Sequence, residues 1–189
     1  MIVGGVRPPQ KAQDVAERGV AVSPYPGAVS PSASEDWKRF SADLALCLSD
    51  LQEDEYLILS AKRANFFVQF AGQGRFGMRV EATSNSYIEE PEAQLTTDDY
   101  ARLTQLGWHL PTRPPHEPGQ PEPPDPDGSP NFFIDPSYPV DFQRLVRLAV
   151  DTLRQVYHVA HPGQLQYKAF VSHGPVIRFP TLRLKREGV

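Results

Sequence analysis

The sequence contains a single cysteine, Cys47, among its 189 residues. An intrachain disulfide and a zinc site built from several thiolates are therefore excluded. No apolar run approaches the roughly 20 residues that a helix needs to span a bilayer. The first residues, Met1 to Arg7, lack the charged region and long apolar core of a signal peptide. We expect a cytoplasmic protein that does not bind membranes.

An excess of positive charge is also missing, since the formal net charge is −4 with 22% charged residues. This balance gives no electrostatic reason to expect a nucleic-acid partner. The sequence has no glycine-rich phosphate loop, no GxSxG nucleophile motif and no dinucleotide-binding fingerprint. We therefore predict a protein that is not an enzyme and that binds no cofactor and no metal.

The remaining residues that could support chemistry each have a simpler interpretation. His158 and His161 have a spacing that suits one helical face, but further zinc ligands are missing, so solvated histidines at a helix end are favoured. Cys47 lies on an apolar helical stripe with no histidine base nearby in the pattern, which favours a core cysteine. Asp98 and Asp99 stand where a helix is expected to begin, so capping explains them.

Proline is abundant, with 20 residues, but it is unevenly distributed. Residues 1–34 combine prolines with few large apolar side chains, which predicts a disordered N-terminal tail. Residues 111–130 contain nine prolines and are predicted to be a flexible loop insertion within a β-hairpin. We expect one domain over 35–171, followed by a C-terminal extension, 172–189, that forms either an edge strand or a disordered end.

Hydrophobic periodicity predicts three helices. The first, over 35–52, follows a capping-box spacing at Ser32–Glu35 and has an apolar stripe that includes Trp37, Phe40 and Leu44. The second begins near Thr97 and ends at a glycine suited to a left-handed cap. The third, over about 139–158, is the most strongly amphipathic.

Strands are predicted between these helices. An antiparallel meander is expected from Tyr56–Ser60, Asn65–Phe70 and 75–83, then a hairpin from Trp108–Leu110 and Asn131–Ile134, with a further strand at Leu165–Phe170. In the third strand Phe76, Met78, Val80 and Ala82 point one way and Arg79 and Glu81 the other. The predicted fold is α+β, in the order α-β-β-β-α-β-β-α, with an antiparallel sheet covered by helices on one face.

Four residues share the sheet face that the helices leave open. They are Phe67, Gln69, Arg79 and Glu81. One interpretation is an ordinary solvated face of an antiparallel sheet. The other is a mixed aromatic and polar surface that binds a partner, with Phe67 as the anchor, because aromatic side chains contribute disproportionately to binding energy.

Several phrases in this order of elements match a known family. They are Phe67-Val-Gln-Phe70, Glu81-Ala-Thr-Ser-Asn85, Leu103-Thr-Gln-Leu-Gly-Trp108 and Ser129-Pro-Asn-Phe132. Over roughly 35–170 the chain resembles the actinobacterial branch of the superfamily that joins type III secretion chaperones with YbjN-like proteins, the TY-Chap domains. The resemblance implies a secretion-chaperone-like domain that binds peptides or partner proteins, without catalysis and often as a homodimer. Glu81, Asn85, Trp108 and Asn131 match recurrent positions that, by this resemblance, shape the sheet and its turns.

Two hypotheses for function follow from the resemblance and the composition. The first is a chaperone-like module that holds a segment of a partner protein on its sheet. The second is a toxin-neutralising immunity protein or a regulatory protein that binds one folded partner.

Overall fold

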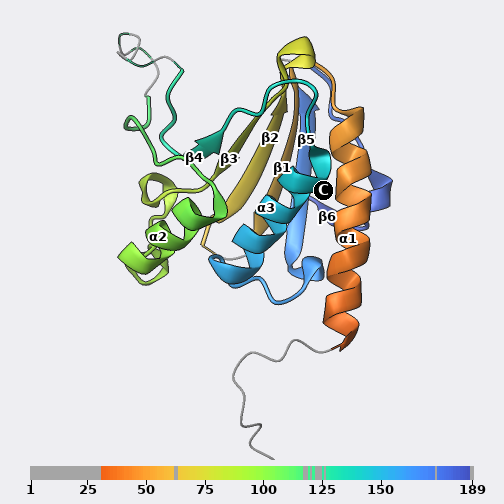
Figure 1. The fold of residues 1–189 in the computed structure, drawn as a ribbon, viewed down its shortest axis with the longest axis horizontal. Helices are drawn as coiled ribbons and strands as arrows, with labels where there is room; N and C mark the ends of the chain where they lie inside the picture. Colours follow the sequence, from red (N-terminus) through yellow and green to blue (C-terminus); the bar gives the residue numbers. More distant parts are fainter. Residues whose placement is uncertain are drawn as a thin grey trace, which may run out of the picture.

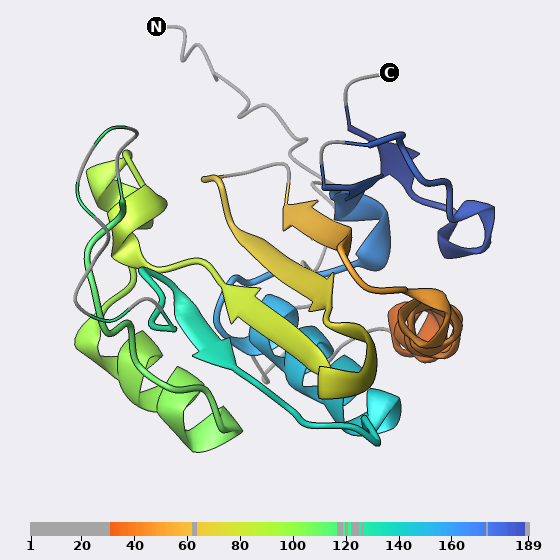
Figure 2. The same cartoon turned by 90° about the horizontal axis from the view of Figure 1, so that it is seen from above.

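A six-stranded sheet runs through the structure, and three α-helices pack on one of its faces (Figures 1 and 2). The computed structural model describes residues 31–61, 64–116, 119, 121, 125, 127–172 and 174–187. The predicted α+β fold is confirmed. Residues 1–30 of the predicted N-terminal tail, 1–34, lie outside the described residues, whereas residues 31–34 belong to α1.

The sheet has the strand order β4-β3-β2-β1-β5-β6. The strands are β1 (Glu55–Ala61), β2 (Phe67–Gly72), β3 (Met78–Ala82), β4 (Phe132–Ile134), β5 (Leu165–Val171) and β6 (Lys185–Arg186). All neighbouring strands pair antiparallel except β5 and β6, which are parallel. The predicted meander is confirmed, and β5 pairs with β1, so β1 is a central strand. The C-terminal extension adds β6 to the edge of the sheet.

The three helices are α1 (Pro31–Asp50), α2 (Thr97–Leu106) and α3 (Phe142–Gln155). α1 begins before the predicted residue 35, at a proline, whose fixed φ suits the first position of a helix. At the start of α2, Thr96 and Asp99 form a reciprocal capping box, and at its end Gly107 adopts the left-handed conformation with φ 111°. The predicted caps of α2 are therefore confirmed.

The core lies between the sheet and the helices because the strands alternate. Leu57, Leu59, Val68, Phe70 and Val80 point toward the helices and are almost fully buried. The apolar stripe of α3 packs against them as predicted. Cys47 is also buried in this core, as expected.

Two buried tryptophans tie α3 to its neighbours. The Trp108 indole donates to the Thr152 hydroxyl at 2.8 Å, and that hydroxyl donates to the Leu148 carbonyl at 2.8 Å. On the other side, the Trp37 indole donates to the Ala160 carbonyl at 3.2 Å, just after α3. The indole N–H groups are thereby satisfied inside the core, as buried tryptophans require.

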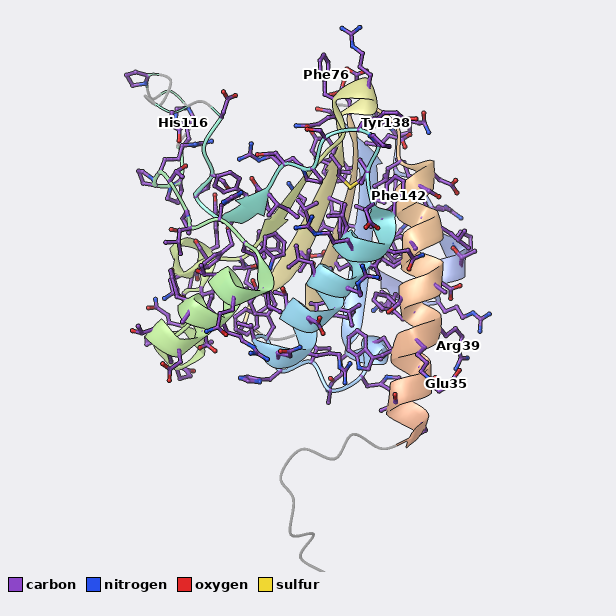
Figure 3. The ribbon with its side chains drawn as sticks, viewed as in Figure 1. Glu35, Arg39, Phe76, His116, Tyr138 and Phe142 are labelled. Carbon is purple, nitrogen blue, oxygen red and sulfur yellow. The ribbon has the colours of Figure 1, made fainter. Side chains whose placement is uncertain are left out.

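Two predictions about the strands were wrong. Trp108–Leu110 forms only an isolated bridge, between His109 and Phe133, because Pro111 has no N–H to donate to the next pair. Phe76 does not join the buried face of β3 but is 63% exposed in a one-turn 3-10 helix (Figure 3). Gly77, with φ 114°, turns the chain between this helix and β3, so the alternation begins only at Met78.

The ends of the proline-rich insertion lie side by side. The Thr112 amide donates to the Ser129 carbonyl at 2.9 Å, and the Arg113 guanidinium donates to the Gly128 carbonyl at 3.0 Å. The hairpin that the sequence predicts around the insertion is thus closed by these contacts as well as by the bridge next to it. In the part of the chain that the structure describes, no helix is both long and apolar enough to cross a membrane.

Candidate functional site

The sheet face opposite the helices is accessible over β1, β2 and β5, and we call this part the open sector. Strand register aligns Ile58 with Gln69 on one side and with Lys168 on the other. Next to this row, the Tyr56 ring stacks on the Phe170 ring with centroids 5.2 Å apart. The open sector consists of Tyr56, Ile58, Ser60, Phe67, Gln69, Ala71, Gln166, Lys168 and Phe170. Its side chains are half-buried or exposed and combine apolar, aromatic and polar groups.

The same face is covered over β3 and β4, and we call this part the covered sector. Arg79 and Glu81 point to this face, but their side chains are only 20% and 16% exposed. The Arg79 guanidinium bonds to Glu81 at 3.1 Å and to the Asp127 carbonyl at 2.9 Å, and it lies 4.9 Å from the centre of the Phe133 ring. The base of the proline-rich loop therefore lies over this half of the face.

Glu81 joins β3 to the residues that follow the loop. One carboxylate oxygen accepts from the Ser129 hydroxyl at 2.9 Å, and the other accepts from the Asn131 side-chain amide at 3.2 Å. The Asn131 side-chain oxygen in turn accepts from the Ser84 amide at 3.3 Å. Of the four residues predicted for partner contact, Phe67 and Gln69 lie in the open sector, whereas Arg79 and Glu81 lie in the covered sector.

The residues predicted to shape the sheet and its turns make contacts within the fold. Besides Asn131, the Asn85 side chain donates to the Leu95 carbonyl at 2.9 Å and accepts from the Leu95 amide at 2.7 Å. This pair closes the segment between β3 and α2. Trp108 reaches α3 through Thr152, as described above.

Two groups, Asp135 beside Arg79 and Cys47 in the core, have pKa values raised by burial. Burial raises the pKa of Asp135, and Arg79, whose guanidinium lies 3.6 Å away, opposes the shift. Burial likewise raises the pKa of the Cys47 thiol, so this thiol stays protonated and is a poor nucleophile. Among the described residues, no group of three or more His, Cys, Asp or Glu side chains could hold a metal ion.

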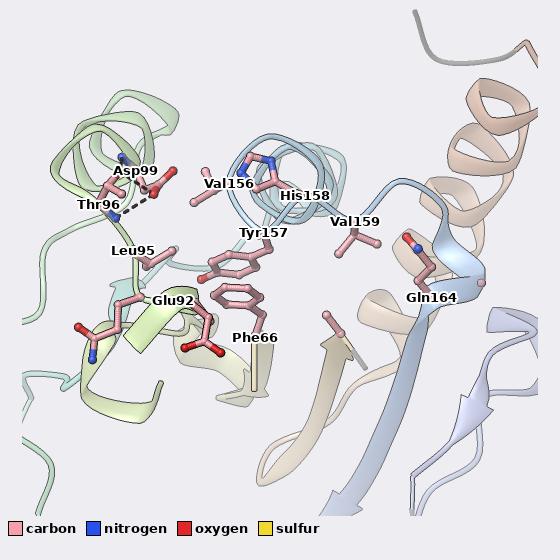
Figure 4. A pocket seen from close by; sticks show the side chains of 14 residues that line it. Phe66, Glu92, Leu95, Thr96, Asp99, Val156, Tyr157, His158, Val159 and Gln164 are labelled. Carbon is pink, nitrogen blue, oxygen red and sulfur yellow. Dashed lines mark hydrogen bonds between the residues drawn. The ribbon is translucent and has the colours of Figure 1, made fainter. Parts of the chain in front are cut away.

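A hollow lies at the end of the sheet where β1 ends and β2 begins, and we call it the end cleft (Figure 4). It has a volume of about 580 Å³ and lies between the end of α3 and the segment that leads into α2. His158 adopts a left-handed backbone with φ 53°, which turns the chain after α3 and brings the Val159 amide to the Leu153 carbonyl at 2.8 Å. This turn forms one wall of the cleft.

The end cleft has an apolar floor and an acidic rim. Phe66 and Tyr157 stack with centroids 4.6 Å apart, and Leu95 lies beside them in the cleft. Glu92 and Asp99 are at the rim, and no lysine or arginine lies among the described lining residues. Sequence reasoning missed this cleft because its walls come from segments near residues 66, 92–99 and 156–164, whose proximity no local pattern indicates.

Comparison with known proteins identifies the domain. The family model described as "T3SS (YopN, CesT) and YbjN peptide-binding chaperone 3" matches residues 30–171, most of the 189-residue chain. No match was found among curated proteins or among solved structures. The matched range covers the helices and the sheet through β5, and the resemblance seen in the sequence is confirmed at the level of the family. The chain belongs to the TY-Chap3 family of type III secretion and YbjN peptide-binding chaperones.

Proposed function

We propose that this protein is a non-enzymatic chaperone-like module that binds a segment of a partner protein on the open sector of its sheet. The observation that supports this most directly is the set of partly exposed aromatic side chains on the open sector, with Tyr56 and Phe170 near one end and Phe67 near the other, on a sheet in a domain of a peptide-binding family. Aromatic side chains on a fixed scaffold bind apolar segments with little loss of conformational entropy. We place this activity in the cytoplasm and propose a homodimer as the oligomeric state.

The short edges of the sheet favour recognition by side chains over strand addition. The edge strands β4 and β6 are three and two residues long. Strand addition needs a longer row of free backbone donors and acceptors to supply affinity. A bound segment would instead lie across the face, with Phe67 and Gln69 in direct contact and the Arg79–Glu81 pair at its margin.

Affinity capture from the lysate of the host tests this proposal. The tagged wild-type chain is compared with a Tyr56→Ala/Phe67→Ala double variant, and the partners are identified by mass spectrometry. Leu46→Ala is the matched control, because Leu46 is 60% exposed on α1, away from the sheet face. We expect the double variant to lose partners that the control retains; equal capture by all three proteins would contradict a site on the open sector.

The same experiment distinguishes the second hypothesis, an immunity or regulatory protein. A chaperone-like module is expected to capture segments that are unfolded in the complex, whereas an immunity protein captures one folded toxin in near-stoichiometric amount. The net charge of −4 suits a basic folded partner, such as a nuclease. Purifying the captured complex and measuring whether the partner is folded separates the two functions.

A further inference from the structure

The end cleft lies close to the point where the N-terminal segment enters the described structure. The first turns of α1 pack against the wall that follows α3: Asp36 and His161 are paired at 2.9 Å, and Trp37 donates to the Ala160 carbonyl. Gln164, in the same wall, lines the cleft (Figure 4). In Figure 1 the N-terminal end of α1 and the C-terminal end of α3 lie at the same end of the molecule. The chain therefore enters the described structure, at residue 31, at the same end of the molecule as the cleft.

The residues just before α1 have a composition that suits the cleft. Residues 20–30 read Val-Ala-Val-Ser-Pro-Tyr-Pro-Gly-Ala-Val-Ser. Pro24, Pro26 and the proline at position 31 disfavour helical backbone at Ser23, Tyr25 and Ser30, so an extended conformation is preferred. Valines and Tyr25 supply apolar surface for the floor, and a tyrosine can stack against the Phe66–Tyr157 pair.

The charge near this segment and the length of the chain before residue 31 are also compatible with binding in the end cleft. Arg18 lies just upstream of this segment, next to Glu17, and the cleft offers it the Glu92 carboxylate, since that of Asp99 is engaged in the capping box of α2 and no lysine or arginine is among the described lining residues. Ten extended residues reach about 33 Å. The segment can therefore extend well beyond residue 31, where the chain enters the described structure.

We propose that residues 20–30 bind in the end cleft of their own chain as an intramolecular peptide, with Tyr25 on the aromatic floor and Arg18 near Glu92. The family model matches from residue 30, so this occupant lies outside the matched domain. While bound, it excludes other extended apolar peptides from the cleft. The proposal concerns a different surface from the open sector and does not depend on it.

Photo-crosslinking in the full chain tests this proposal. A benzophenone-bearing phenylalanine analogue replaces Tyr25, and the crosslinked peptides are identified by mass spectrometry after irradiation. We expect crosslinks to residues 92–99 or 156–164 within one molecule, with a yield independent of protein concentration. Crosslinks to the open sector, crosslinks only between two copies, or no crosslink to the cleft would each overturn the proposal.

A cleft-filling variant provides the second measurement. Ala93→Trp places a large side chain in the cleft, whereas Ala101→Trp, at an exposed position of α2, is the matched control. Thermal unfolding first establishes that both variants are folded. We expect the position-25 crosslink to fall at least fivefold in Ala93→Trp and to remain in Ala101→Trp. An unchanged crosslink in a folded Ala93→Trp protein would overturn the proposal.

Discussion

The open and covered sectors belong to one face of one sheet, yet they differ in what lies above them. In the open sector Phe67 and Gln69 face outward and remain accessible. In the covered sector Arg79 and Glu81 have the same orientation but are held by the base of the proline-rich loop. Side chains alternate between the two faces in the same way in both sectors. Contacts with the base of the proline-rich loop therefore decide which polar side chains can reach a partner.

The largest effect is expected from Glu81→Ala, which breaks the covered sector. It removes the nearer of the two carboxylates that pair with the mostly buried Arg79 guanidinium, leaving only Asp135 at 3.6 Å, and it removes the acceptor of Ser129 and Asn131. We expect the free energy of unfolding to fall by about 2–4 kcal/mol. Urea denaturation measures this. Asp135→Asn is the control, because Asp135 is more exposed and lies farther from Arg79, and a loss as large as that of Glu81→Ala would contradict the assignment.

The next effect concerns Phe67→Ala in the open sector. Because this side chain is only partly buried, we expect the free energy of unfolding to fall by about 1 kcal/mol or less. Affinity for the captured partner should fall roughly 5- to 30-fold, as expected when an aromatic anchor is truncated. Isothermal titration and urea denaturation of the same variant separate the two effects. A large stability loss with unchanged affinity would reverse the roles that we give to the two sectors.

Two deletions in the proline-rich loop test which of its residues stabilise the covered sector. Replacing residues 115–124 by a short glycine linker keeps Arg113, Asp127 and Gly128, so the melting temperature should stay within about 2 °C of the parent. Extending the deletion to 113–128 removes the carbonyl that Arg79 binds and the contact between Arg113 and Gly128. We expect an additional loss of about 1–2 kcal/mol. Equal melting temperatures for the two deletions would show that the loop base contributes nothing.

The smallest effect is a pH dependence at the rim of the covered sector. Burial raises the pKa of Asp135 in the folded state, so the folded protein binds this proton more tightly than the unfolded chain. The stabilisation from Asp135 is therefore fully present below its ordinary pKa and is lost as the pH rises through the raised pKa. Unfolding of wild type and Asp135→Asn between pH 3 and 7 measures the difference, and the opposite trend would contradict the shift.

Local signals predicted much of the fold. Thr96 and Asp99 mark the start of α2, Gly107 marks its end, and the periodic stripe of α3 is buried as expected, because these features depend on residues within a few positions of one another. Phe76 shows where this reasoning fails. Alternation counted back from Met78 places Phe76 on the buried face, but Gly77 reorients the chain before the strand begins.

The candidate sites were predicted less completely. Phe67 and Gln69 lie on an accessible face, as the alternation indicates. The burial of Arg79 depends on Asp127, 48 residues away, and the end cleft depends on three separate segments. Such contacts follow from tertiary packing, which hydrophobic periodicity does not encode.

The two tryptophans give the domain a pair of optical reporters. Trp37 is fixed to the chain just after α3 and Trp108 to Thr152 in the last turn of α3, so each indole senses a different neighbour of this helix. Emission from both should be blue-shifted in the folded state and shift to the red when either side is exposed to water. Single-tryptophan variants, Trp37→Phe and Trp108→Phe, would therefore resolve whether α1 and α2 separate from α3 in one transition or in sequence.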